Sequence, residues 1–311
     1  MRHYLLTHRT THTHPGTVES SYGRALLLPR HTAEQVVHHA QLDVSPAPRE
    51  RRRFEDLSGN RMAFFHVTEP HTVLEVTARS VVSVDRPHVD AVTLPQLAWD
   101  QVTALVRAVR TTGRPGDGGR PSPREVLHIA TGSLPSARVP LSERAQALAL
   151  DTFAPGQSLA AALTLLASRI ARAFEHRSGT VSHPLEDVLT NGRGTSGDLA
   201  HVMIAALRSL GVAALYVSGY LARSSPHSAD VPHAWVAVWF PGAGWVHADP
   251  TTGGFIDNRH VILGWGRDHL DVTPLRGIAY SDGSGPAIDV EVDLRTLGSE
   301  DLAAILHGGE P

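Results

Sequence analysis

Three side chains in the C-terminal half of the chain have the types and spacing of a nucleophile, a general base and an orienting acid. Ser196 opens a predicted helix, His233 begins a predicted strand, and Asp249 ends the next one. The first turn of a helix exposes unpaired N–H groups, and neighbouring strands can present two side chains at one sheet edge. If the three converge, Ser196 attacks a carbonyl, His233 accepts its proton, and Asp249 fixes the imidazole tautomer. The predicted chemistry is acyl transfer through a serine.

The elements predicted around these residues favour such convergence. Residues 196–210 have the periodicity of an amphipathic helix, and Gly211 follows where a helix C-terminus favours glycine. Strand-like runs cover 212–221, 234–240 and 245–248, with polar or Gly/Pro-rich turns between them. A buried helix followed by an antiparallel sheet is an α+β arrangement.

The remaining sequence divides into further parts by its patterning. Alternating apolar residues, as at 72–78, indicate strands early in the chain. Helices are expected at 95–110, from near Ser142, and after Ser158 as an N-cap. Residues 288–294 alternate strictly, which is typical of a strand with one solvated face. The expected parts are a β-rich N-terminal domain (1–88), a helix with a Gly/Pro-rich linker (89–140), a core with a C-terminal strand (141–298) and a tail (299–311).

Composition excludes several classes of site and partner. The chain has no cysteine, so thiolate metal sites, disulfides and cysteine nucleophiles are ruled out. A formal net charge of -3 gives no drive toward nucleic acids or anionic membranes. No apolar run approaches the length of about 18 residues that a membrane helix needs. We expect a cytoplasmic protein that needs no cofactor.

Three segments, in order, carry a family resemblance. Residues 194–201 read Gly-Thr-Ser-Gly-Asp-Leu-Ala-His, residues 233–236 read His-Ala-Trp-Val, and residues 244–251 read Gly-Trp-Val-His-Ala-Asp-Pro-Thr. They resemble the three motifs of the transglutaminase-like superfamily, whose first motif, Gly-Val-Cys-Gln-Asp-Phe-Ala-His, opens the central helix. The resemblance extends to both ends of the chain. The chain resembles the N-terminal region of bacterial members at His8 and at residues 29–30, 59–60 and 70–71. It resembles their C-terminal segment at residues 266–268 and 274–277.

The resemblance implies a papain-like core, with a central helix packed on an antiparallel sheet, after a β-rich N-terminal domain. It also implies a Cys-His-Asp triad and acyl transfer or hydrolysis at peptide, protein or small-amide substrates. Here Ser196 and Gly197 stand where the family has Cys-Gln. Since a serine hydroxyl cannot form the standing ion pair that a thiol forms with imidazole, this exchange predicts a large loss of activity unless His233 acts as a true general base.

The alternative function is therefore a catalytically disarmed pseudoenzyme that binds a peptide or protein partner in the old cleft. Locally, Thr195 with Asp198 three residues later fits a capping box, which would make Ser196 incidental. In the catalytic interpretation, Thr195 and Gly197 belong to the helix N-terminus that holds the oxyanion.

Four further residues are candidates for contacting the substrate. Trp235 and Trp245 flank the proposed site, either as core of the sheet or as a wall of the cleft. Asp198 and His201 lie three residues apart on one helix face, where a local hydrogen-bonded pair is the simpler interpretation. A metal site is the remaining alternative. It is disfavoured because no His-Glu-x-x-His helix or comparable tight pair is present.

Overall fold

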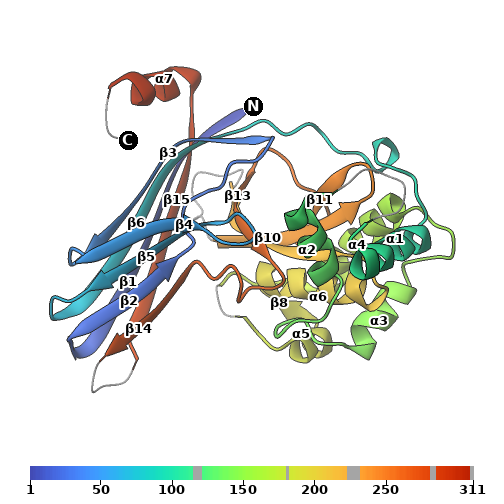
Figure 1. Cartoon of the computed structure of the whole chain (residues 1–311), viewed down its shortest axis with the longest axis horizontal. Helices are drawn as coiled ribbons and strands as arrows, with labels where there is room; N and C mark the ends of the chain where they lie inside the picture. Colours follow the sequence, from blue (N-terminus) through green and yellow to red (C-terminus); the bar gives the residue numbers. More distant parts are fainter. Residues whose placement is uncertain (115–120, 180–181, 223–231, 281–284, 309–311) are drawn as a thin grey trace.

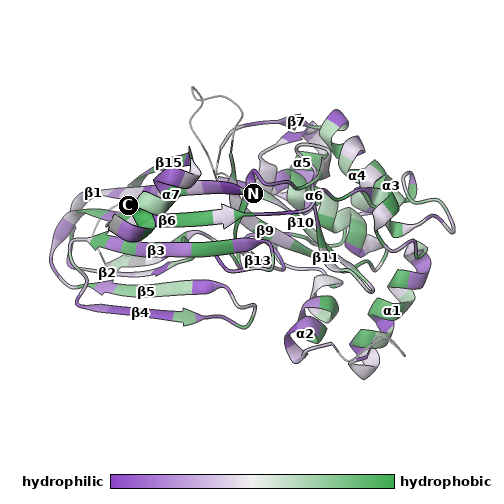
Figure 2. Ribbon diagram, turned by 90° about the horizontal axis from the view of Figure 1, so that it is seen from above, coloured by the Kyte–Doolittle hydropathy of each residue, from purple (hydrophilic) through white to green (hydrophobic). Residues whose placement is uncertain are grey.

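Both ends of the chain build one half of the molecule, and its middle builds the other. The computed structural model describes residues 1–114, 121–179, 182–222, 232–280 and 285–308. In Figure 1 the blue N-terminal strands and red C-terminal strands lie together on one side, with helices α1–α6 on the other. Figure 2, seen from above, shows the same separation.

The strand-rich half consists of two four-stranded antiparallel sheets, ordered β15-β1-β6-β3 and β14-β2-β5-β4. The strands are β1 (Arg2–Val18), β2 (Ser20–Ala25), β3 (Gln35–Ser45), β4 (Glu50–Glu55), β5 (Arg61–Val67), β6 (His71–Val84), β14 (Leu275–Tyr280) and β15 (Ala287–Leu297). Alternate residues of β1 are buried, as its sequence pattern predicts. The expected β-rich N-terminal domain is present.

The C-terminal strand, expected as part of the core region 141–298, pairs in the structure with strands from the start of the chain. β15 pairs with β1 from His3↔Leu297 to Thr13↔Ala287, and β14 pairs with β2. A period of two shows that a segment is a strand but not which strand it joins. The expected tail also differs, because its residues Ser299–Gly308 form helix α7.

The second half is a helical layer on a five-stranded sheet. The helices are α1 (Trp99–Thr112), α2 (Pro123–Gly132), α3 (Glu143–Leu150), α4 (Leu159–Ala173), α5 (Leu185–Asn191) and α6 (Ser196–Ser209), with a short 3-10 helix at Ala91–Thr93. The sheet order is β12-β11-β10-β9-β13, from β9 (Ala214–Leu221), β10 (Pro232–Phe240), β11 (Gly244–Asp249), β12 (Gly254–Phe255) and β13 (His260–Gly266). The short strands β7 (Glu175–His176) and β8 (Arg193–Gly194) pair beside α6. α6 is buried along most of its length, as a central helix must be.

Local capping rules explain where several helices begin. Ser142 and Ser158 accept hydrogen bonds from the N–H groups of Ala145 and Ala161, which confirms the expected helix start near Ser142 and the expected N-cap at Ser158. Helix α2 is not among the predicted helices and lies in the segment expected to be a linker. Ser122 caps it and Pro123 occupies its first turn. Residues 115–120 of that linker lie outside the described part of the chain.

Buried amide side chains join the two halves along β13. The side chain of Gln35 donates to the carbonyl of Ile262 and accepts from its N–H, each at 2.8 Å. Asn60 bonds in the same way to the N–H and carbonyl of Trp265, each at 2.9 Å. A Cβ on Gly264 would lie 2.6 Å from Oδ1 of Asn60, so this contact requires glycine on β13. The strand-rich half therefore supports the strand on which His260 lies.

Candidate active site

Ser196 is the first residue of α6, immediately after its cap. Thr195 Oγ1 accepts from the N–H of Asp198 at 3.3 Å, and Asp198 Oδ2 accepts from the N–H of Thr195 at 3.0 Å. This is the capping box that the sequence suggested. It occupies the N–H of Thr195, which is then not available to an oxyanion. Among the described residues, no hydrogen-bond acceptor engages the N–H groups of Ser196 and Gly197.

Asp198 anchors this turn through three hydrogen-bond contacts of its carboxylate. The backbone N–H of His183 donates to Oδ1 at 2.9 Å, and Nδ1 of His183 lies 2.7 Å from Oδ2. Burial raises the pKa of Asp198, but the hydrogen bonds from His183 and Thr195 outweigh it and leave that pKa below its ordinary value. The expected pair between Asp198 and His201 is not formed, because Nε2 of His201 accepts from the N–H of His269 at 3.2 Å.

His233 and Asp249 meet at the end of the core sheet. His233 is near the start of β10 and Asp249 ends the neighbouring β11. Nε2 of His233 lies 2.9 Å from Oδ2 of Asp249, and both side chains are buried. The N–H of Thr251 donates to the other carboxylate oxygen at 2.8 Å. With Nε2 engaged, Nδ1 is the ring nitrogen left to act as a base.

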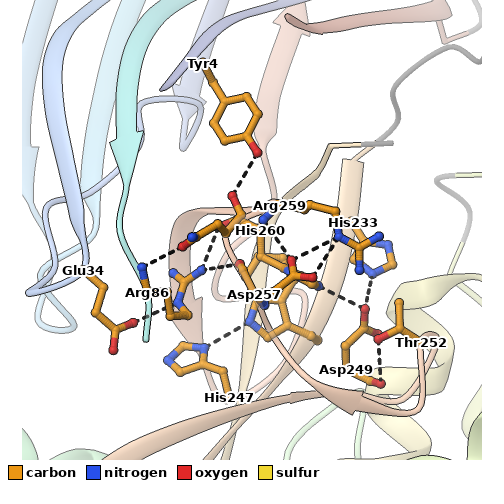
Figure 3. Close-up of polar contacts among 12 residues, drawn as sticks. Tyr4, Glu34, Arg86, His233, His247, Asp249, Thr252, Asp257, Arg259 and His260 are labelled. Atoms are coloured by element: carbon orange, nitrogen blue, oxygen red, sulfur yellow. Dashed lines mark hydrogen bonds and ion pairs between the residues drawn. The ribbon is translucent and has the colours of Figure 1, made fainter. Parts of the chain in front are cut away.

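A second histidine, His260, contacts the same aspartate. Its Nε2 lies 3.3 Å from Oδ2 of Asp249, and its Nδ1 lies 3.2 Å from Oδ1 of Asp257 (Figure 3). Nδ1 is also 3.2 Å from the N–H of Asp257, which would donate to a neutral ring. Burial lowers the pKa of His260, but the two carboxylates outweigh it and raise it overall. That direction favours the cation, donating to both carboxylates.

The strand-rich half holds the turn that carries His260. Arg86, just after β6, donates from Nη1 to the carbonyls of Asp257 at 2.6 Å and His260 at 3.2 Å. Its backbone N–H donates to Oδ1 of Asn258, and Glu34 accepts from its Nε at 2.8 Å. Figure 3 shows these contacts as one chain from Glu34 to His260. The imidazole is thus positioned by a distant part of the sequence.

Gly219 on β9 lies across from His233 and makes room for the cluster. A Cβ on Gly219 would lie 2.5 Å from the Trp235 ring and 2.2 Å from the carbonyl of Val261. Trp235 in turn lies edge-on to His260, with ring centroids 5.2 Å apart. Because Gly219 has no side chain, Trp235 on β10 and His260 on β13 can contact each other across β9.

Ser196 and His233 line one cavity of about 220 Å³ between the two halves. Within the described chain, the Ser196 hydroxyl makes no hydrogen bond to His233. Among the described residues, the lining of the cavity includes no acidic side chain and no arginine. From the strand-rich half, the wall is formed by His8, Thr10, His12, Ile288 and Val290. From the core half, Ser182, Gly197, Tyr216, Ser218 and His269 contribute.

The cavity wall from the strand-rich half is not among the predicted site residues. His8, Thr10 and His12 alternate along β1, so their shared face was readable from the period of two. Burial lowers the pKa of His8 to about 4, so this wall carries a neutral imidazole at pH 7.

The four residues expected to contact substrate do not line this cavity. Trp235 is fully buried and donates to Nδ1 of His247 at 3.0 Å. Trp245 packs against the core, edge-on to His128. Asp198 and His201 are buried, the first in the capping box and the second under Tyr216. The core interpretation holds for both tryptophans.

His233, Asp249 and His260 also have the composition of a metal site. They offer three ligand atoms, all within 4.8 Å of one another. In the structure these atoms instead hydrogen-bond to each other, and neither Asp249 nor His260 lines the described cavity. An ion here would displace the His233–Asp249 hydrogen bond.

None of the helices in the described ranges has the length and apolar character to cross a membrane.

Two family models match the chain. Residues 4–83 match the bacterial transglutaminase-like N-terminal region, and residues 146–250 match the transglutaminase-like superfamily. The second match contains Ser196, His233 and Asp249.

Bacterial relatives cover nearly the whole chain. An uncharacterized protein of Mycobacterium bovis is 37% identical over 306 residues, covering 94% of this chain and 92% of its own. An uncharacterized protein of Mycobacterium leprae is 30% identical over 302 residues, covering 94% and 98%. Among solved structures, a proposed cysteine protease of Cytophaga hutchinsonii superposes with a TM-score of 0.70 at 20% identity, covering 94% of this chain and 90% of that one. These matches confirm the expected α+β fold with its β-rich N-terminal region.

Proposed function

This chain belongs to the transglutaminase-like superfamily, and on that premise we propose that it is an amide- or peptide-directed hydrolase or acyl transferase with Ser196 as nucleophile. One observation supports this proposal most strongly. Asp249 engages Nε2 of His233, which leaves Nδ1 as base, and His233 shares a cavity with Ser196. The substrate is a peptide, a protein side chain or a small amide.

The proposed reaction runs through an acyl-serine. Ser196 Oγ bonds to the carbonyl carbon, its proton passes to Nδ1 of His233, and the carbonyl electron pair moves onto oxygen. Collapse of this intermediate breaks the C–N bond, and His233 returns the proton to the leaving amine. Water then releases the acid, or a second amine takes the acyl group. Asp249 stabilises the imidazolium throughout.

A fluorophosphonate tests this proposal without knowledge of the substrate. Ser196 Oγ would displace fluoride from phosphorus, and peptide mass spectrometry would locate the adduct. We expect labelling at Ser196 that is lost in Ser196→Ala and slowed about 10³-fold in His233→Ala. Labelling elsewhere, or at equal rates in all three proteins, would reject the serine triad.

One observation favours the alternative, a disarmed protein that binds a peptide in the cleft. Ser196 and His233 line the same cavity but make no hydrogen bond to each other within the described chain. The variant Ser196→Cys separates the two functions, because its thiol is the only one in the protein. Fast alkylation by iodoacetamide at pH 6, lost in Ser196→Cys/His233→Ala, together with no phosphonate labelling of Ser196, would identify an intact but disarmed site.

A further inference from the structure

The hydroxyl of Tyr216 lies against the first turn of α6. Tyr216 is on β9, lines the cavity beside Ser196, and is otherwise buried. A Cβ built on Gly197 would lie 2.8 Å from this hydroxyl. Real side chains do not approach a neighbour so closely, so the hydroxyl occupies space that only glycine leaves open.

Two histidines fix the ring from which this hydroxyl projects. His201, one turn into α6, lies tilted on the ring with centroids 4.9 Å apart, and His269 meets it edge-on at 5.9 Å. The N–H of His269 donates to Nε2 of His201, which joins the two clamping residues. The ring cannot swing away from Gly197 without disrupting this packing.

The hydroxyl is a donor without an assigned acceptor. It has no hydrogen-bond partner in the described part of the chain, although a buried tyrosine normally finds one. Burial raises the pKa of Tyr216, with Asp198 and Asp268 adding to the shift, so the phenol stays protonated at neutral pH.

We propose that Tyr216 is a further catalytic residue, whose hydroxyl donates a hydrogen bond to the oxyanion formed on attack by Ser196. This inference rests on the proposed function. In the step itself, the Ser196 Oγ–carbon bond forms, the carbonyl electron pair becomes the oxyanion, and the serine proton goes to His233. Tyr216 keeps its proton and donates a hydrogen bond to the oxyanion. The N–H groups of Ser196 and Gly197, which the capping box leaves unpaired, are the other donors.

The rate of phosphonylation reports on this donor, because the phosphoryl oxygen occupies the oxyanion position as fluoride leaves. We expect Tyr216→Phe, which keeps the clamped ring, to slow fluorophosphonate labelling of Ser196 about 100-fold. Tyr22→Phe on the distant strand β2 is the matched control, and we expect it to label at the wild-type rate.

Gly197→Ala provides a second test by adding the Cβ that would collide with the hydroxyl. Alanine is favourable in a helix, so this variant should fold even if Tyr216→Phe does not. We expect it to slow labelling at least 10-fold, and the double variant Gly197→Ala/Tyr216→Phe to be no slower than Tyr216→Phe alone.

The outcomes are distinguishable. If the wild-type protein is labelled and Tyr216→Phe is labelled at the same rate, the role of Tyr216 is overturned and the serine triad stays in place. Additive losses in the double variant would show that Gly197→Ala acts independently of the hydroxyl, which also contradicts the proposal. No labelling of the wild-type protein would overturn the proposed function, and the role of Tyr216 with it.

Discussion

His233 and His260 approach one and the same carboxylate oxygen, since their Nε2 atoms lie 2.9 and 3.3 Å from Oδ2 of Asp249. Burial would raise the pKa of Asp249, but the hydrogen bonds from both histidines outweigh it and hold that pKa far below its ordinary value. These hydrogen bonds therefore favour the ionised form of the carboxylate. Its position depends on a residue outside the proposed triad.

Replacing His260 tests that dependence. His260→Leu removes the donor to Asp249, and we expect it to lower the free energy of unfolding by about 1–3 kcal/mol, measured by urea denaturation. Phosphonate labelling should also slow, because the imidazole of His233 loses a fixed partner. His260→Gln retains an amide donor and should restore part of both losses. Equal effects of Leu and Gln would show that His260 acts through packing alone.

Arg86 should influence the same site from the strand-rich half. Arg86→Lys keeps the charge but has one nitrogen, so it cannot replace both the Nε that donates to Glu34 and the Nη1 that donates to the carbonyls of Asp257 and His260. We expect slower phosphonate labelling than in wild type. In a His260→Leu background the substitution should have little further effect on labelling, because both act on one turn. A full additional loss in that background would separate the two residues.

Local rules on the sequence account for much of the frame. The stripe and capping box of α6, the caps Ser142 and Ser158, and the strands β9 to β11 all follow from patterns within a few residues of each other. The family motifs add the pairing of His233 with Asp249, which the structure shows as a hydrogen bond. Such features need no knowledge of distant contacts.

What the sequence did not reveal depends on pairing between distant strands. His260 is one of 20 histidines, and its contact with Asp249 depends on the pairing of β13 with β9. Tyr216 sits in an apolar strand, where a core aromatic is the ordinary interpretation. β15 alternates like any half-exposed strand, so its place beside β1, and the cavity wall it forms, were unreadable.

Acid should destabilise the protein through buried histidines such as His201. Burial lowers its pKa to about 4, from an ordinary value near 6.5. Between these values the unfolded chain binds a proton that the folded protein does not. Stability is then lost as pH falls from about 6.5 to 4, by up to about 1.4 kcal/mol per pH unit for one proton. We expect His201→Gln to flatten the dependence of the urea-unfolding free energy on pH in this range. Parallel curves for the two proteins would contradict the assignment.

Metal ions should not be needed for labelling and should inhibit it. Zn²⁺ would coordinate Nε2 of His233 and the carboxylate of Asp249 only by breaking their hydrogen bond. We therefore expect EDTA-treated protein to keep its phosphonate labelling rate, and added Zn²⁺ to lower it in wild type more than in His260→Gln. Loss of labelling with EDTA and its return with Zn²⁺ would instead assign the cluster to a metal.

Gly219 should be among the glycines least tolerant of substitution. A Cβ there would meet the carbonyl of Val261 at 2.2 Å and the ring of Trp235 at 2.5 Å. Because one of these neighbours is backbone of the paired strand β13, relief requires β9 and β13 to separate. We expect Gly219→Ala to lower the free energy of unfolding by about 1–3 kcal/mol in urea and to slow phosphonate labelling, since His260 and Trp235 are displaced. Gly16→Ala is the matched control, because nothing described lies within 4 Å of its new Cβ. Equal stability of the two variants would show that the strands adapt to the extra methyl group, and that the close packing across β9 does not position the site.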